Sequence, residues 1–260
     1  MYNNFKEKII PSLKAKRKEI GIYKDIPINF SHKLSNEGYI DIREAGLSGV
    51  NHYFDSNNPP YYCSISGAIE GLFLRKSIIL KLVKINKKLN DKGLELYFFD
   101  CYRPVKVQQF LYDIWLPIYL KKMHPNFSEE DLLKQRDLYS AKAPNSENEI
   151  DRKAPPPHTT GAAMDVTLRF KASKEQLFMG TIFDDTTKLV HTDYFESKKF
   201  KNSLSISEEE ALKNRRILYH SMKEEGIENY PFEWWHYSWG DQMWAVLSKK
   251  NEAFYSNMNL

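Results

Sequence analysis

A histidine and an aspartate that stand seven residues apart, His158 and Asp165, are the first pair in this sequence that could bind a metal. Apolar and polar residues alternate after Asp165, which predicts a strand that carries the carboxylate on one face. His158 would lie on the opposite face of a flat strand, so Gly161 must bend the chain if the two side chains are to converge. An imidazole and a carboxylate that converge suit a divalent zinc ion. The alternative is a loop histidine beside an exposed strand aspartate.

A second histidine stands near the C-terminal end, in the segment Glu233-Trp-Trp-His236. His236 would complete a set of three nitrogen and oxygen ligands, the number that catalytic zinc sites use while leaving a fourth position to water. Glu233 is close in sequence, as a general base for that water should be. An extended strand would place the two residues on opposite faces, so the backbone must turn or bulge, or Glu233 must reach in from the head of the strand. The alternative is a surface glutamate beside a core histidine.

Arg103 stands where a predicted strand meets a predicted helix. Residues 94–99 form a continuous apolar run, and Pro104 has the fixed φ and missing N–H that suit the first turn of a helix. We expect that helix to run from Val105 to about Tyr112 and to kink or end at Pro117. An arginine at such a junction can face a metal site and stabilise an oxyanion there. The alternative is an arginine that is tied to a backbone carbonyl or a nearby carboxylate.

Four segments resemble the zinc D-alanyl-D-alanine dipeptidases, a family that includes the vancomycin-resistance dipeptidases. They are Asp100–Pro104, Pro157–Asp165, Met179–Asp184 and Asn229–His236. They occur in the order that the family has, and the likeness extends over most of the chain. Each motif alone is weak, whereas the four together are specific.

The resemblance implies one zinc ion per chain, held by His158, Asp165 and His236. It implies that Glu233 takes a proton from the attacking water and returns it to the leaving amine, and that Arg103 stabilises the oxyanion. The expected reaction is hydrolysis of small D-Ala-D-Ala-type dipeptides whose termini are both free.

The resemblance also implies a residue that binds the free amino group of the substrate. Asp184 is that candidate, although Asp185 follows it directly and is an alternative. His191 is a further candidate for a supporting contact or a purely structural role. The resistance dipeptidases carry a serine two residues before the first histidine ligand, where this chain has Pro156, which offers neither a hydroxyl nor a backbone donor. The exact dipeptide preference therefore stays open.

Two other functions compete with the dipeptidase. One is a cell-wall carboxypeptidase or endopeptidase on the same fold, which needs an open groove for a longer peptide. The proline- and polar-rich loop 144–157 favours a closed pocket instead. The other is a zinc-bearing binding module without catalysis, which would have no need for Glu233 and Arg103.

Composition indicates an ordinary soluble globular protein. The 260 residues are 42% hydrophobic and 28% charged, with a formal net charge of +4 and basic residues scattered among acidic ones, which argues against nucleic-acid binding. The two cysteines, Cys63 and Cys101, are expected to be buried free thiols. We find neither a signal-peptide core nor an apolar run long enough to span a membrane, so a cytoplasmic protein is expected. The oligomeric state and the physiological role do not follow from the sequence.

The whole chain, residues 1–260, is expected to form one zinc dipeptidase domain of the α+β class. An antiparallel sheet should carry the zinc site, with helices packed outside it. The other expected elements are an N-terminal arm or helix within residues 1–30, a strand at 39–43, a helix at 66–92 that stops at Gly93, helices begun by caps at Ser128 and Ser207, the second ending near Gly226, and a last strand at 231–239.

Overall fold

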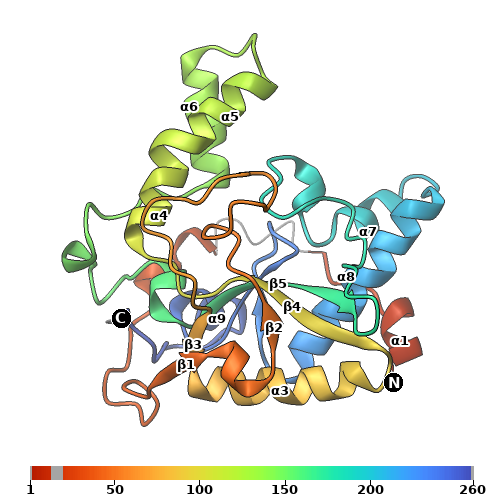
Figure 1. Ribbon diagram of the computed structural model, residues 1–260, viewed down its shortest axis with the longest axis horizontal. Helices are drawn as coiled ribbons and strands as arrows, with labels where there is room; N and C mark the ends of the chain where they lie inside the picture. Colours follow the sequence, from red (N-terminus) through yellow and green to blue (C-terminus); the bar gives the residue numbers. More distant parts are fainter. Residues whose placement is uncertain (1, 13–19, 259–260) are drawn as a thin grey trace.

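A mixed sheet lies at the centre of the computed structural model, which describes residues 2–12 and 20–258 (Figure 1). In this described part, the strand order is β2-β4-β5-β7-β6. The bounds are β2 Ser48–Gly49, β4 Leu94–Asp100, β5 Ala163–Phe170, β6 Glu228–Asn229 and β7 His236–Ser238. The β2–β4 pair is parallel and the other pairs are antiparallel, so the fold is α+β as expected, but the expectation of a purely antiparallel sheet is wrong.

A second pairing shortens the helix that the sequence predicts over residues 66–92. Residues Phe73–Arg75 form strand β3, which pairs with β1, Tyr39–Asp41, and helix α3 therefore runs only from Lys76 to Asn90. The buried positions of α3 recur at helical spacing, and Gly93 follows with a left-handed φ of 73°. The helix thus ends where the sequence predicted, while its start is displaced because strand pairing takes residues 73–75.

The longer helices pack against the sheet and against each other. Helix α3 contacts β4, helix α8 (Ile206–Glu224) contacts β5, and the two helices touch. Helix α8 is capped by Ser205, whose hydroxyl accepts from the Glu208 N–H, so the capping box expected at Ser207 lies two residues earlier. Three short helices lie elsewhere in the described chain: α1 Tyr2–Glu7, α7 Tyr194–Lys199 and α9 Gln242–Leu247.

A pair of helices projects from the body as an arm (Figure 1). Helix α4 (Val105–Phe110) continues through a π-helical turn at Leu111–Trp115 into α5 (Leu116–Met123), and α6 (Glu129–Tyr139) packs back against α5. Pro117 lies in the first turn of α5, a position that a proline tolerates, so it does not end the helical path. Ser128 caps α6 as predicted.

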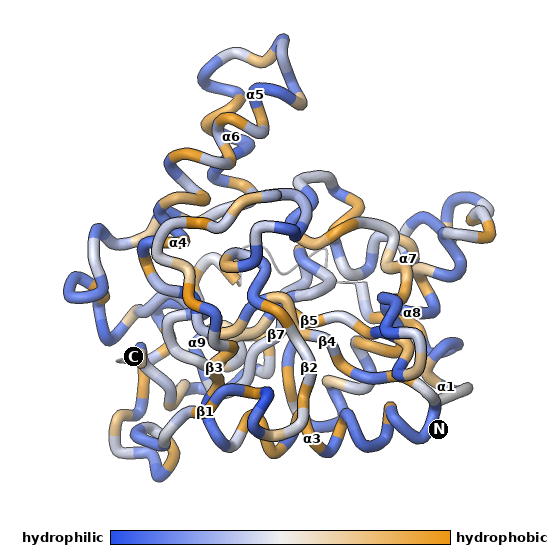
Figure 2. The backbone as a smooth tube through the Cα atoms, in the orientation of Figure 1, coloured by the Kyte–Doolittle hydropathy of each residue, from blue (hydrophilic) through white to orange (hydrophobic). Residues whose placement is uncertain are grey.

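The hydrophobic core surrounds the central strands (Figure 2). It includes Leu82 and Leu89 of α3 and buried side chains of both β4 and β5. Cys101 is buried as expected, whereas the thiol of Cys63 is exposed, which corrects that prediction. Within the described residues, no helix has the length and apolar character needed to cross a membrane.

The N-terminal region is partly described. Helix α1 contacts α8, as the expected short helix would, while residues 13–19 of the predicted arm lie outside the described residues.

Candidate active site

Two of the three predicted ligands are partners across adjacent strands, and the third comes from the turn that precedes one of these strands. In the register of the sheet, Asp165 on β5 lies opposite His236 on β7, and Asp100 on β4 lies on the other side of Asp165. Cross-strand partners share a face of the sheet, so the three side chains lie in a row. His158 comes from the short 3-10 turn Pro157–Thr160 that precedes β5.

Gly161 makes the bend that brings His158 onto the same side as Asp165. Its φ is 65°, in the left-handed region. A Cβ atom at this position would lie 2.2 Å from the sulfur of Met258, so a side chain would clash as well as strain the backbone. The predicted bend at Gly161 is therefore present, as a left-handed turn at the end of a 3-10 helix.

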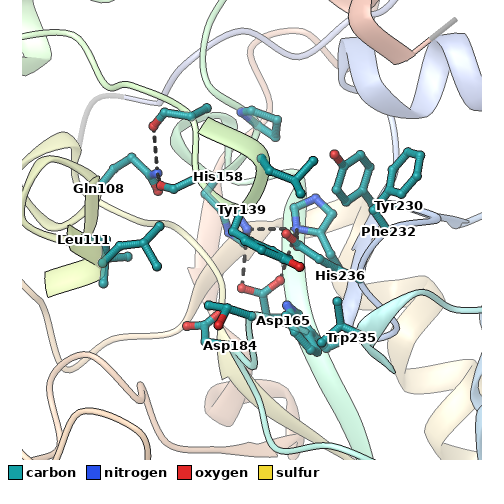
Figure 3. Close-up of a pocket in the computed structure, with 18 of the residues that line it drawn as sticks. Gln108, Leu111, Tyr139, His158, Asp165, Asp184, Tyr230, Phe232, Trp235 and His236 are labelled. Carbon is teal, nitrogen blue, oxygen red and sulfur yellow. Dashed lines mark hydrogen bonds and ion pairs between the residues drawn. The ribbon is translucent and has the colours of Figure 1, made fainter. Parts of the chain in front are cut away.

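His158, Asp165 and His236 offer a compact set of donor atoms (Figure 3). Nε2 of His158 lies 3.2 Å from Nδ1 of His236, and the two Asp165 oxygens lie 3.5 Å and 3.1 Å from these nitrogens. A tetrahedral zinc ion with ligands at about 2.0–2.2 Å would separate its ligand atoms by about 3.3–3.6 Å. The three side chains therefore fit such an ion, and we call them the pocket floor.

The hydrogen bonds of His158 leave the correct nitrogen for a metal. Its Nδ1 lies 2.7 Å from the carbonyl oxygen of Cys101, which can only accept, so Nδ1 carries the proton and Nε2 keeps a lone pair. Burial by itself would raise the pKa of Asp165, but the neighbouring His158 and His236 hold the pKa of this carboxyl below its ordinary value. Burial raises the pKa of Asp100 to about 6, although Arg103 and His158 oppose that rise.

Glu233 lies beside the pocket floor on a turn. The turn occupies residues 231–235 and strand β7 begins only at His236, so the strand expected over 231–239 is wrong at its start. The turn is held by Asn229, whose amide donates to the carbonyls of Glu233 and His236. The Glu233 carboxylate lies 3.8 Å from Nδ1 of His236, and its side chain is 28% exposed. Burial against the pocket raises the pKa of Glu233 well above its ordinary value, with Asp165 contributing to the rise.

Arg103 also reaches the pocket floor, with its guanidinium between two carboxylates. Nε donates to Asp100 at 2.8 Å and one Nη donates to Asp165 at 2.8 Å. The other Nη donates to Gln108 at 2.9 Å, and the guanidinium stacks over the ring of Tyr53. The Nη that donates to Asp165 also lies 3.5 Å from Nε2 of His158, so these contacts occupy up to four of the five N–H donors of the arginine. Arg103 thus holds Asp165 in place while it lines the pocket.

Asp184 lies on a different wall of the same pocket. It has a left-handed φ of 57°, and its Oδ2 accepts hydrogen bonds from the hydroxyls of Tyr53 at 2.9 Å and Tyr61 at 2.6 Å. Burial raises the pKa of Asp184 to about 6, against the opposing effect of Arg103. Asp185 also lines the pocket, but its carboxylate accepts from the Thr187 N–H of its own loop.

The cavity above the pocket floor has a volume of about 430 Å³. Residues 137–141, at the end of α6 and just after it, form one side that we call the outer wall, and Figure 3 labels Tyr139 of this wall. The sequence predicted that loop 144–157 would close the pocket, yet Pro157 is the only residue of that loop among the lining residues described, and the wall comes from 137–141 instead. Gln108 joins this wall to the site, since its amide donates to Ser140 Oγ and to the Ala141 carbonyl.

Several lining residues carry no motif that sequence reasoning could use. Tyr53 and Tyr61 come from a turn-rich loop, and Gln108 and Tyr139 come from the helical arm. Their contacts with the site depend on the fold, and a tyrosine or glutamine alone gives no signal. His191 contributes its backbone carbonyl to Arg215 and packs its ring on Phe232.

Known proteins resemble this chain over most of its length. The sequence model described as D-ala-D-ala dipeptidase matches residues 70–257. A D-alanyl-D-alanine dipeptidase of Synechocystis sp. is 29% identical over 73% of this chain and 79% of its own length. Proteins with the same description from Enterococcus faecalis and Enterococcus faecium are each 26% identical, over 64% and 62% of this chain and 73% and 70% of their own lengths.

Proposed function

The chain belongs to the D-ala-D-ala dipeptidase family, whose members are metallopeptidases, and from this premise we propose a zinc-dependent hydrolase of D-Ala-D-Ala-type dipeptides with free termini. One observation carries the proposal. The donor atoms of His158, Asp165 and His236 lie within 4.8 Å of one another, in a pocket that Glu233 and Arg103 also line. We propose that the chain acts as a single catalytic domain.

The pocket floor would hold one zinc ion per chain. Two imidazoles and a carboxylate form the donor set that zinc accepts in catalytic sites with three protein ligands. When bound, the ion would supply Lewis-acid polarisation of the scissile carbonyl and a water of lowered pKa. Arg103 and Cys101 would support the ligands by fixing the Asp165 carboxylate and the His158 tautomer.

Glu233 would act as the general base. Its carboxylate lies 3.8 Å from Nδ1 of His236 in the same pocket, and burial raises its pKa above the ordinary value of a glutamate, which helps a group that must take up a proton and return it. It would take a proton from the attacking water while the oxygen of that water bonds to the peptide carbon. It would then give the proton to the amine nitrogen as the carbon–nitrogen bond breaks.

Arg103 and Asp184 would bind opposite charges of the substrate. The guanidinium would stabilise the negative charge that develops on the scissile carbonyl oxygen, through its positive charge and the N–H donor that its four contacts leave over. The Asp184 carboxylate would bind the free ammonium group of a dipeptide. The two tyrosine hydroxyls that Asp184 accepts from stabilise its ionised form.

Two rival functions stay distinct from this proposal. A carboxypeptidase or endopeptidase on longer peptides would need an open groove, whereas the outer wall stands beside the pocket floor. A non-catalytic zinc-binding module would need neither Glu233 nor Arg103 beside the ligands.

A substrate panel tests the proposal. Purified zinc-loaded protein would be assayed with D,D-, L,D- and L,L-dipeptides, one tripeptide and one N-acetylated dipeptide. We expect small D,D-dipeptides to be cleaved fastest and the N-acetylated form to lose most activity. Comparable turnover of the tripeptide or the acetylated substrate would favour the carboxypeptidase function instead.

Metal analysis tests the ligands separately. We expect about one zinc per chain, and its loss in His158→Ala and His236→Ala. Full zinc retention in both variants would overturn the ligand assignment.

A further inference from the structure

Two arginines that are neighbours on α8, Arg215 and Arg216, are both buried but bind different parts of the molecule. Arg216 forms a two-bond ion pair with Glu196 and donates to the carbonyl of Lys6. Arg215 is 1% exposed, and all three hydrogen bonds that the structure describes for it go to backbone carbonyls. The Arg216 contacts are those of a structural ion pair, whereas the Arg215 contacts need another explanation.

The three acceptors of Arg215 lie at the two ends of one segment. Nε donates to Met179 at 2.7 Å, and the two Nη atoms donate to Leu189 at 2.8 Å and His191 at 2.7 Å. The segment between these acceptors, residues 179–191, carries Asp184. Three charge-assisted bonds to backbone oxygens fix the path of the chain itself, whatever the side chains along it are.

The same segment is joined to the turn that carries Glu233. Trp234 donates from its indole to Thr181 Oγ1 at 2.8 Å and from its backbone N–H to the Val190 carbonyl at 3.0 Å. The ring of Trp234 also lies 5.9 Å from the Arg215 guanidinium, on which Phe195 stacks at 4.7 Å. Arg215 therefore lies at the point where the Asp184 segment and the Glu233 turn meet.

The backbone conformation of Asp184 needs hydrogen bonds that fix the path of the chain around it. A non-glycine residue with a left-handed φ of 57° is strained, and strain of this kind persists only where the surroundings fix the chain. Burying a cation without a carboxylate partner is itself costly, so the three carbonyl bonds must offset that cost. A salt bridge would be a simpler way to hold α8, as Arg216 shows.

We propose that Arg215 is a positioning residue that fixes residues 179–191 so that Asp184 faces the pocket and binds the substrate amine. This inference rests on the proposed function, because it assigns Arg215 to the amine end of the same site. It concerns neither the pocket floor nor the general base.

Matched variants test the proposal. Arg215→Lys keeps the positive charge but lacks the planar guanidinium, so it cannot donate to all three carbonyls. Arg216→Lys makes the same change at the next residue of α8 and is the control. Amide hydrogen–deuterium exchange should become faster across residues 179–191 in Arg215→Lys and stay at the parent rate there in Arg216→Lys. For a free dipeptide, KM should rise about tenfold or more in Arg215→Lys, with a smaller change in kcat and zinc content unchanged.

A double-mutant cycle separates positioning from a general loss of stability. If Arg215 acts through Asp184, adding Arg215→Lys to Asp184→Asn should raise KM little further. Additive effects on KM would overturn the proposal, as would equal exchange rates over residues 179–191 in the two arginine variants. If Arg215→Lys does not fold, Arg215→Gln decides, because its uncharged amide can still donate to one of the carbonyls but cannot hold both ends of the segment. Unchanged exchange and KM in that variant would also overturn it.

Failure of the proposed function would appear differently. In that case the zinc-loaded parent would cleave none of the dipeptides, while the exchange comparison between Arg215→Lys and Arg216→Lys would still show whether Arg215 holds the segment.

Discussion

The pocket floor and the outer wall face the same cavity but are built in different ways. On the floor, Asp165 and His236 are direct partners across two adjacent strands, and their relative position is set by the hydrogen bonds of the sheet. The outer wall, residues 137–141, comes from the C-terminal end of α6, where the projecting helical arm returns to the body. It reaches the site through side-chain contacts such as those of Gln108.

The two regions have different tasks: the pocket floor carries the catalytic chemistry, and the outer wall selects the substrate. A metal site requires donor atoms held to within a fraction of an ångström, and paired strands provide this for Asp165 and His236. His158 lies on a 3-10 turn and is fixed instead by the bond between its Nδ1 and the Cys101 carbonyl. A wall that selects substrates by size can be moved or replaced without disturbing the ligands. We therefore expect changes at the pocket floor and at the general base Glu233 to act mainly on kcat. Changes at the surrounding walls should act mainly on KM.

Glu233→Gln should give the largest effect. Glutamine is nearly isosteric but cannot accept a proton near neutral pH, so kcat should fall about 10²–10⁴-fold or more. Zinc content and melting temperature should stay close to those of the parent. Retained activity would mean that Glu233 is not the base, and loss of zinc together with activity would mean that Glu233 supports or joins the ligand set.

Asp184→Asn should act on binding instead. The amide keeps the shape of the side chain but cannot pair with an ammonium group, and a hydrogen bond between charged groups contributes about 1.5–3 kcal/mol, so KM should rise about 10–150-fold. The change in kcat should be smaller. Asp185→Asn is the matched control. A rise in KM in the control with none in Asp184→Asn would move the amine site by one residue.

The features predicted correctly from the sequence are local ones. Strand β4, strand β5 and the cap of α6 depend on residues that are close in the chain. The approach of the three predicted ligands depends on motifs that lie far apart, and it was inferred through a family resemblance. Periodicity alone gives no cross-strand register, because it cannot tell which strands are neighbours.

The sequence predictions are wrong where two neighbouring residues could play the same role, or where a distant segment pairs with the one predicted. Both Ser205 and Ser207 have a glutamate three residues later, and only the folded backbone shows that Ser205 makes the capping bonds. Residues 73–75 continue an apolar helical pattern, but their pairing with residues 39–41 makes them a strand. The periodicity of the sequence predicts neither which serine caps the helix nor which segments pair as strands.

The pH dependence of KM should distinguish the amine end from the floor. The pKa of Asp184 is raised to about 6, so the carboxylate is ionised above that pH and loses its charge below it. The substrate amine stays protonated over this range, so KM should rise about tenfold between about pH 7 and pH 5. In Asp184→Asn the KM profile should be flat over the same interval. An equally steep profile in that variant would assign the titration to another group.

Gln108→Ala should give the smallest effect, because it removes only the link between Arg103 and the outer wall. Of the three hydrogen bonds described for the Gln108 side chain, only the one from Arg103 involves a catalytic residue. At about 0.5–1.5 kcal/mol net, its loss should lower kcat/KM for a dipeptide about 2–10-fold. The neighbouring Gln109 donates to the Pro144 carbonyl instead, which makes Gln109→Ala the matched control. Since a loosened wall admits longer chains, the ratio of tripeptide to dipeptide cleavage should rise in Gln108→Ala alone. If the two variants behave alike, the outer wall does not select substrate length, and the dipeptide limit must be set by Asp184 and the tyrosines around it.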